Sequence, residues 1–170
     1  MPLTLDEISE KLDAVKIKHS TRDGRIRLSF RTDVYEDTDG DDCLSITIWT
    51  EHQGETLRLH CLGAYRLPTD EFPAKLAAVQ RTLNQLNWET KLAQYEMDTE
   101  DGEIRMGIDV AIEDGTVTEK QLRRLVQMLP NMADRDYAAI RAALDHGTVY
   151  VTHEELCRRF DAAMIARDKR

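Results

Sequence analysis

The chain of 170 residues carries 23 Lys and Arg against 32 Asp and Glu, which gives a formal net charge of −9 at pH 7. One packed domain fits this length, because a chain of roughly 150 residues buries enough surface to fold without metal or disulfide staples. The acidic balance argues against nucleic acid and against anionic membranes as partners, since both need a basic footprint on the protein.

The first half of the chain predicts one helix followed by four antiparallel strands. Thr4 and Glu7 form a capping box among apolar residues at helical spacing, which is typical of an amphipathic helix. Apolar and polar residues then alternate on both sides of a turn at residues 22–24, as in a β-hairpin. A second alternating pair, joined through residues 51–54, follows an acidic loop at residues 36–42.

The next part predicts a helix and two more strands. Thr69 is expected to cap a helix whose apolar residues recur at steps of four and three, with Pro73 tolerated near its first turn. Strands are expected around residues 92–97 and 103–112, where apolar residues alternate again. Strands in groups, with helices between the groups, favour an α+β fold with an antiparallel sheet and flanking helices.

The last part predicts helices. A capping box at Thr118 opens a helix, Pro130 is expected to end or kink it before the helical period resumes, and Gly147 stops it. We expect residues 1–147 to form one α+β domain. Residues 148–170 are expected to add a C-terminal helical extension that packs on the same domain.

No motif in the sequence indicates an enzyme or a cofactor. The chain lacks the glycine-rich loops that hold phosphates and dinucleotides, and it lacks the Gly-x-Ser-x-Gly turn of serine hydrolases. Its five histidines do not have metal-ligand spacing on a helix or a strand. Cys43, Cys61 and Cys157 are widely spaced and odd in number, which is typical of reduced thiols. We therefore expect no catalytic residues and no cofactor.

The acidic loop has a pattern that fits a specific ligand. Asp37, Asp39 and Asp41 alternate around Gly40, and hard oxygen ligands at this spacing can converge on calcium. The pattern departs from an EF-hand, because Ile48 stands where the closing bidentate Glu should be. A solvated hairpin loop explains the same composition, so both interpretations stay open.

Two apolar residues fall on the second face of the predicted sheet. Trp49 and Leu62 alternate with the residues assigned to the core. Such groups are either covered by the C-terminal helices or form a docking or dimer surface. Trp49, Leu62 and Tyr65 are the candidate residues for contact with a partner.

Short motifs in the chain are similar to those of a known family. They are Leu57-Arg58-Leu59-His60-Cys61, Arg66-Leu67-Pro68, Thr82-Leu83-Asn84-Gln85-Leu86-Asn87, Glu96-Met97-Asp98-Thr99-Glu100-Asp101-Gly102-Glu103-Ile104-Arg105 and Leu122-Arg123-Arg124-Leu125. In these stretches, and in the order of elements from about Val15 to Leu144, the sequence resembles the YbjN-like family, which is related in fold to type III secretion chaperones. The resemblance implies a chaperone-like α+β domain, commonly a homodimer, with no catalytic residues to carry over. The acidic loop and the tail from His146 depart from the family core.

The leading hypothesis is a non-catalytic cytoplasmic module, chaperone-like or regulatory, that holds a segment of a client polypeptide. Its acidic surface is expected to favour basic clients. The alternative is a small-molecule or metal-responsive regulatory domain that uses the loop at residues 37–42 or a pocket beneath the tail helix. The cytoplasm is the expected location, because the N-terminus has no basic start followed by an apolar core and no window approaches roughly 18 apolar residues.

Overall fold

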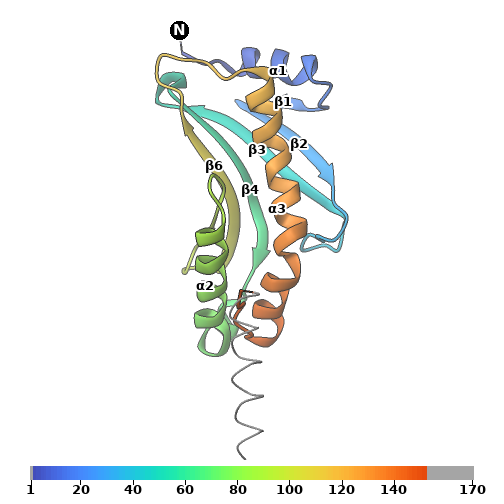
Figure 1. Cartoon of the computed structure of the whole chain (residues 1–170), viewed down its shortest axis with the longest axis vertical. Helices are drawn as coiled ribbons and strands as arrows, with labels where there is room; N and C mark the ends of the chain where they lie inside the picture. Colours follow the sequence, from blue (N-terminus) through green and yellow to red (C-terminus); the bar gives the residue numbers. More distant parts are fainter. Residues whose placement is uncertain (1, 153–170) are drawn as a thin grey trace, which may run out of the picture.

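The computed structural model describes residues 2–152. In this part of the chain, one antiparallel sheet has the strand order β1-β2-β3-β4-β6-β5, and helices pack against it (Figure 1). The strands are β1 (Ser20–Arg22), β2 (Arg25–Arg31), β3 (Cys43–Glu51), β4 (Thr56–Arg66), β5 (Gln94–Met97) and β6 (Glu103–Ala111). The helices are α1 (Leu5–Ala14), α2 (Phe72–Glu89) and α3 (Glu119–His146), with short 3-10 turns at His52–Gly54 and Thr69–Glu71. The predicted α+β fold is confirmed.

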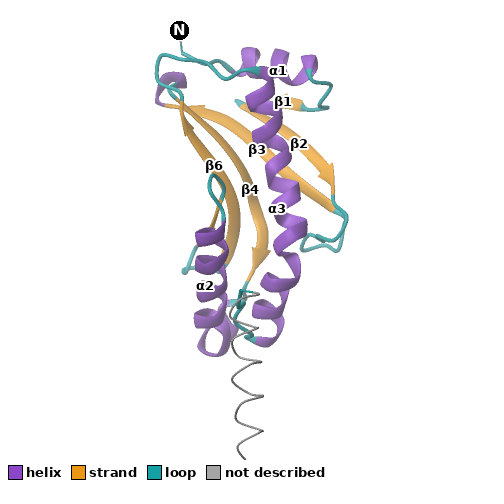
Figure 2. Cartoon of the chain, in the orientation of Figure 1, coloured by secondary structure: helices purple, strands orange, loops and turns teal. Residues whose placement is uncertain are grey.

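The core lies between the sheet and its helices. Helix α3 runs across one face of the sheet, α2 packs beside it, and α1 lies at the upper end (Figure 2). Side chains at paired positions form a continuous apolar row across four strands, because Ile26 pairs with Ile48, Ile48 with Leu59, and Leu59 with Ile108. All four side chains are at most 1% exposed. The alternation in the sequence therefore predicted the inner face correctly.

A bulge in β4 interrupts the regular pairing with β6. Cys61 pairs with Met106, whereas Tyr65 pairs with Ile104, so β4 has two extra residues in between. Leu62 is 46% exposed in this bulge. Tyr65 faces the core, and its ring packs edge to face against Tyr35 with the ring centroids 5.4 Å apart.

Pro130 was expected to end or kink the last predicted helix of the domain, and of these two alternatives the structure rules out the end. The helix is continuous over 28 residues, with Pro130 buried inside it. Proline removes one backbone hydrogen bond, but the buried residues on both sides of it, among them Leu129 and Ala133, hold the helix against the sheet. Despite its length, α3 is too polar to cross a membrane, and no other helix of residues 2–152 has the length and hydropathy of a membrane span.

The predicted start of α2 is wrong, whereas the predicted end of α3 is confirmed. Thr69 does not cap α2, because a 3-10 turn at Thr69–Glu71 comes first and Glu71 is the N-cap residue. Gly147 does end α3 in the left-handed conformation, with its N–H donated to the carbonyl of Ala143. The chain then runs beside α2, where the N–H of Tyr150 donates to the Thr82 hydroxyl at 3.0 Å. The expected C-terminal helix falls on residues 153–170 and lies outside the described residues.

Candidate functional site

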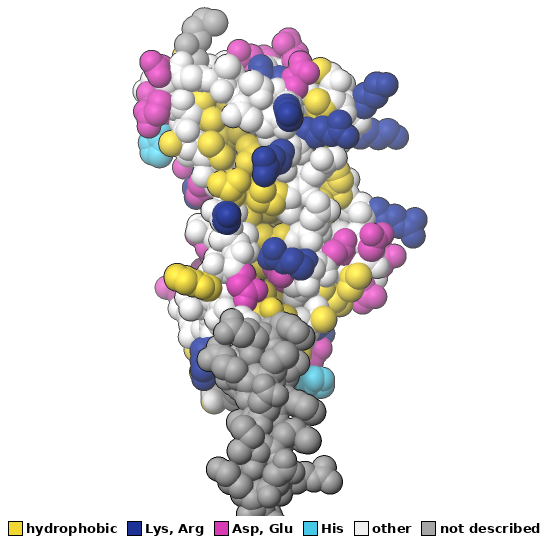
Figure 3. Space-filling model, in the orientation of Figure 1, with side chains coloured by type: hydrophobic (Ala, Val, Ile, Leu, Met, Phe, Trp, Pro, Cys, Tyr) yellow, Lys and Arg dark blue, Asp and Glu magenta, His cyan; other side chains and the backbone are white. Residues whose placement is uncertain are grey.

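A groove of about 990 Å³ opens between the N-terminal half of α3 and the chain that leaves α2. One wall is formed by Glu89, Thr90, Lys91 and Leu92. The other wall is formed by Lys120, Arg123, Arg124, Gln127, Met128, Asn131, Met132 and Arg135 of α3. Figure 3 shows a stripe of hydrophobic side chains beside α3 with Lys and Arg side chains along it.

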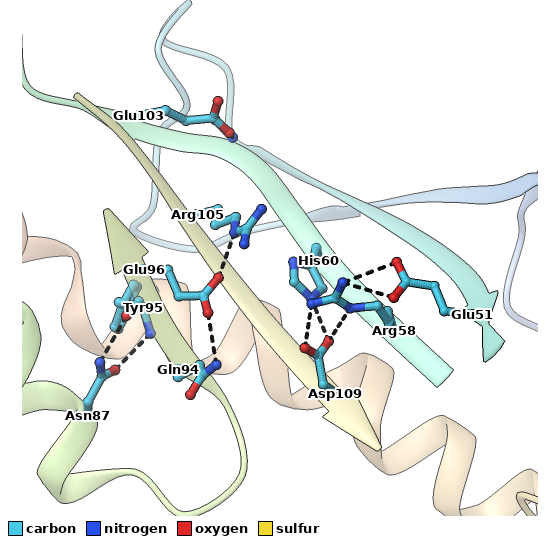
Figure 4. A network of polar contacts seen from close by, with 11 residues as sticks. Glu51, Arg58, His60, Asn87, Gln94, Tyr95, Glu96, Glu103, Arg105 and Asp109 are labelled. Atoms are coloured by element: carbon cyan, nitrogen blue, oxygen red, sulfur yellow. Dashed lines mark hydrogen bonds and ion pairs between the residues drawn. The ribbon is translucent and has the colours of Figure 1, made fainter. Parts of the chain in front are cut away.

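The groove exists because α2 ends early. Thr90 has an extended backbone, and its hydroxyl donates to the carbonyl of Leu86 at 2.9 Å, which terminates the helix. Asn87 then fixes the start of β5, since its side-chain oxygen accepts the N–H of Tyr95 at 2.7 Å and its amide donates to the Tyr95 carbonyl at 2.9 Å (Figure 4). On the side of the groove, the N-terminal half of α3 thus faces the chain that leaves α2 and not α2 itself.

Apolar side chains form the floor of the groove. Met132 is 3% exposed, Met128 is half-buried, and Leu92 is 57% exposed. Methionine adapts its shape to different partners, because its side chain is unbranched and its sulfur is polarizable. This floor therefore suits an apolar surface that packs against it from outside.

Basic side chains surround this floor. Arg123 and Arg124 stand three and four residues after Lys120 on α3, so both lie on the same side of the helix as Lys120, and Lys91 faces them from the other wall. Within the described part of the chain, none of these four cations forms an ion pair. The groove is therefore locally positive, although the whole chain carries a net charge of −9.

A buried polar network fixes the lower end of the groove. Asp136 is 3% exposed, accepts the hydroxyl hydrogen of Tyr95 at 3.0 Å, and pairs with the Arg135 guanidinium at 2.6 Å. Burial raises the pKa of Tyr95 far above its usual range. Arg135 also donates to the hydroxyl of Thr90, so the network ties α3 to the end of α2.

The opposite face of the sheet is open and carries Trp49. This ring lies half-buried between two guanidinium groups, those of Arg25 at 5.2 Å and Arg58 at 5.5 Å from its centroid. Its indole N–H donates to Glu51 at 2.9 Å. The sequence predicted that Trp49 faces away from the core, and the structure confirms this orientation.

His60 lies beside Trp49 and is 2% exposed. Its Nε2 is 2.7 Å from an Asp109 oxygen, and Arg58 donates to both oxygens of the same carboxylate (Figure 4). Hydrogen bonds from Arg58 and His60 hold the pKa of Asp109 below its usual range. The ring covers Gly107, where a Cβ atom would come within 3 Å of it. His60 is thus a packing residue of this face, closed off from solvent.

The three candidate contact residues occupy different places. Trp49 is on the open face, Leu62 is exposed in the β4 bulge, and Tyr65 is 2% exposed in the core. Tyr65 is buried because the pairing of β4 with β6 turns its ring toward Tyr35, and its contact with a partner stays a prediction. Partner contact by Trp49 and Leu62 stays a prediction.

The acidic loop is organised by its own backbone. Asp37 accepts the N–H groups of Asp39 and Asp41, each at 2.9 Å, through a single carboxylate oxygen. Residues 2–152 contain no group of three or more His, Cys, Asp or Glu side chains placed to hold a metal ion. The three aspartates thus form a turn and do not converge as calcium ligands.

The described residues form a small α+β domain with a groove beside α3. Comparison with protein families gives a match over residues 4–142 to YbjN, described as "Putative bacterial sensory transduction regulator". This match spans the sheet and nearly all of the three helices, so the chain belongs to the YbjN family. No curated protein matches the sequence.

Proposed function

We propose that this chain is a non-catalytic regulatory module of the cytoplasm that holds a segment of another polypeptide in the groove beside α3. The observation that carries the proposal is the groove itself, which combines an apolar floor with Lys91, Lys120, Arg123 and Arg124, four cations that form no ion pair among residues 2–152. An amphipathic segment gains free energy from such a surface by burying its apolar side and pairing its charges. The family's description as a regulator supports a role in binding and not in catalysis.

Site-specific photo-crosslinking tests this proposal in the full-length protein. A photoreactive phenylalanine analogue replaces Gln127, which is exposed in the groove, or Ser45, which is exposed on the open face. We expect a defined polypeptide to be crosslinked from position 127 and not from position 45. The crosslink should disappear when Arg123 and Arg124 are both changed to Glu.

Two other outcomes contradict the proposal. A crosslink from position 45 that is lost in Trp49→Ala would move the binding site to the open face. Specific thermal stabilisation by a metabolite or metal panel, with no crosslink from position 127, would favour the small-molecule or metal-responsive regulator, because a ligand at 100 times its Kd adds about 2.7 kcal/mol.

We also propose that the chain forms a homodimer, as the family resemblance implies. Trp88 on α2 is the residue to test, since at 85% it is the most exposed large hydrophobic side chain of the described residues. Light scattering coupled to size-exclusion chromatography should give about twice the chain mass of 19.6 kDa. Trp88→Glu should return the mass to that of one chain. A wild-type mass of one chain would contradict the dimer.

A further inference from the structure

We infer that the groove takes an acidic amphipathic helix, about 15 residues long, from a partner protein. This inference rests on the proposed function and names the chemistry of the segment. It departs from the expectation, based on net charge, that the clients are basic. The distribution of charge around the groove, the length of its α3 wall and the absence of strand residues from its described lining carry it.

The charges around the groove favour an acidic segment over a basic one. Cations flank the floor from both walls, with Lys91 on one side and Lys120, Arg123 and Arg124 on the other, whereas Glu89 is the single acidic residue among the described ones that line the groove. An apolar segment with carboxylates on both flanks meets this arrangement, and arginine binds carboxylates in a two-pronged geometry. A basic segment would meet like charges on both sides.

The length of the α3 wall indicates the length of the bound helix. Residues 120 to 135 of α3 line the groove, and 15 steps at 1.5 Å per residue give a wall of about 22 Å. A helix of about four turns matches this wall. Its apolar residues, spaced three and four apart, would pack on Met128, Met132 and Leu92.

The elements that line the groove favour a bound helix over a bound strand. An extended peptide binds by adding to a sheet edge, where free N–H and carbonyl groups are available. The groove is lined by side chains of α3 and by residues 89–92, whereas strand β5 begins later, at Gln94. Within α3 the carbonyl and N–H groups bond along the helix, except at Pro130, which has no N–H to donate. A ready-made helix, which satisfies its own backbone, therefore fits this groove better than a strand.

Fluorescence anisotropy with three synthetic peptides tests the inference on the full-length protein. The first is a 15-residue amphipathic helix with Asp and Glu flanking its apolar stripe, the second has the same composition in scrambled order, and the third carries Lys in place of the acidic residues. We expect the first peptide to bind at least ten-fold tighter than the other two, with affinity that falls as salt rises.

Two variants with the same change in charge locate the binding site. Arg123→Glu with Arg124→Glu reverses two exposed groove cations, and Arg27→Glu with Arg31→Glu reverses two exposed cations of the open face. The groove variant should weaken the first peptide at least ten-fold, and the open-face variant should stay within two-fold. Thermal unfolding checks that both variants remain folded.

Several results would overturn the inference. Equal binding of the scrambled peptide would show a charge effect without a helix, and tighter binding of the Lys peptide would reverse the sign. Tighter binding of a single-stranded oligonucleotide would assign the cations to phosphates. A groove variant that also loses its dimer mass would assign the groove to a second copy of the chain. A crosslink from position 127 without peptide binding would leave the proposed function standing and reject only the acidic helix.

Discussion

Gly102→Ala is expected to lower the free energy of unfolding by roughly 3–5 kcal/mol, since overpacking and backbone strain each cost roughly 1–3 kcal/mol. A Cβ atom at this position would lie 1.9 Å from the carbonyl oxygen of Leu67, so the backbone would have to move. The residue also has a φ of +79°, which favours glycine. Its carbonyl accepts the N–H of Leu67 at 3.0 Å, so the movement would separate the turn before β6 from the end of β4.

Urea unfolding followed by circular dichroism measures this effect, and Gly40→Ala is its matched control. Gly40 has a φ of +85°, but nothing lies within 4 Å of its added Cβ. The control therefore carries the left-handed strain without the clash, and it should cost about 1–2 kcal/mol. Equal losses in the two variants would show that the clash with Leu67 does not decide the stability.

Asp134→Ala is expected to cost about 2–4 kcal/mol, because hydrogen bonds to a charged group are worth roughly 1.5–3 kcal/mol each and do not add fully. One oxygen of Asp134 accepts the backbone N–H groups of Asp33, Val34 and Tyr35 at 3.1, 2.8 and 2.8 Å. These bonds join α3 to the loop that places Tyr35 in the core. Asp145→Ala is the control, since it breaks an exposed pair with Arg141 and should cost less than about 1 kcal/mol.

The same carboxylate makes the stability depend on pH. Partial burial raises the pKa of Asp134, but hydrogen bonds from the backbone of Tyr35, Val34 and Asp33 outweigh it, so the pKa lies below its usual range. A lowered pKa in the folded state stabilises the protein above the unfolded pKa of about 3.9, and the contribution is lost as pH falls below this value. The difference between wild type and Asp134→Ala should therefore shrink from pH 7 to pH 3. A constant difference over this range would contradict the assignment.

Local patterns predicted the elements, and long-range packing decided the rest. The alternation from Leu57 to Cys61 gave the inner face of β4, and the same alternation already pointed Tyr65 inward, since the two extra bulge residues preserve the parity. An end of the helix at Pro130 was one of two alternatives that its local cost predicts, and the helix continues because the burial of α3 that offsets this cost comes from the sheet.

The groove was missed for the same reason. Lys120, Arg123 and Arg124 stand at helical spacing in the sequence, and Met128 and Met132 follow at steps of four. This pattern is the only feature of the sequence that could have indicated the groove, and it is equally typical of a helix with a solvated basic face beside a stripe of core residues. What turns it into a groove is the early end of α2 at Glu89, and no local feature of the later residues encodes the distance between two helices.

The uneven charge of the molecule has a kinetic consequence. With a net charge of −9, an approaching acidic segment is repelled over most of the surface and attracted near the cations beside α3. Encounters are thus rare, but those that occur are already oriented, so the association rate should respond to ionic strength in two opposing ways: salt weakens the long-range repulsion first and the local attraction second. Repulsion by the rest of the acidic surface disfavours encounters in the wrong orientation, and this adds to the selectivity for segments that bind in the groove.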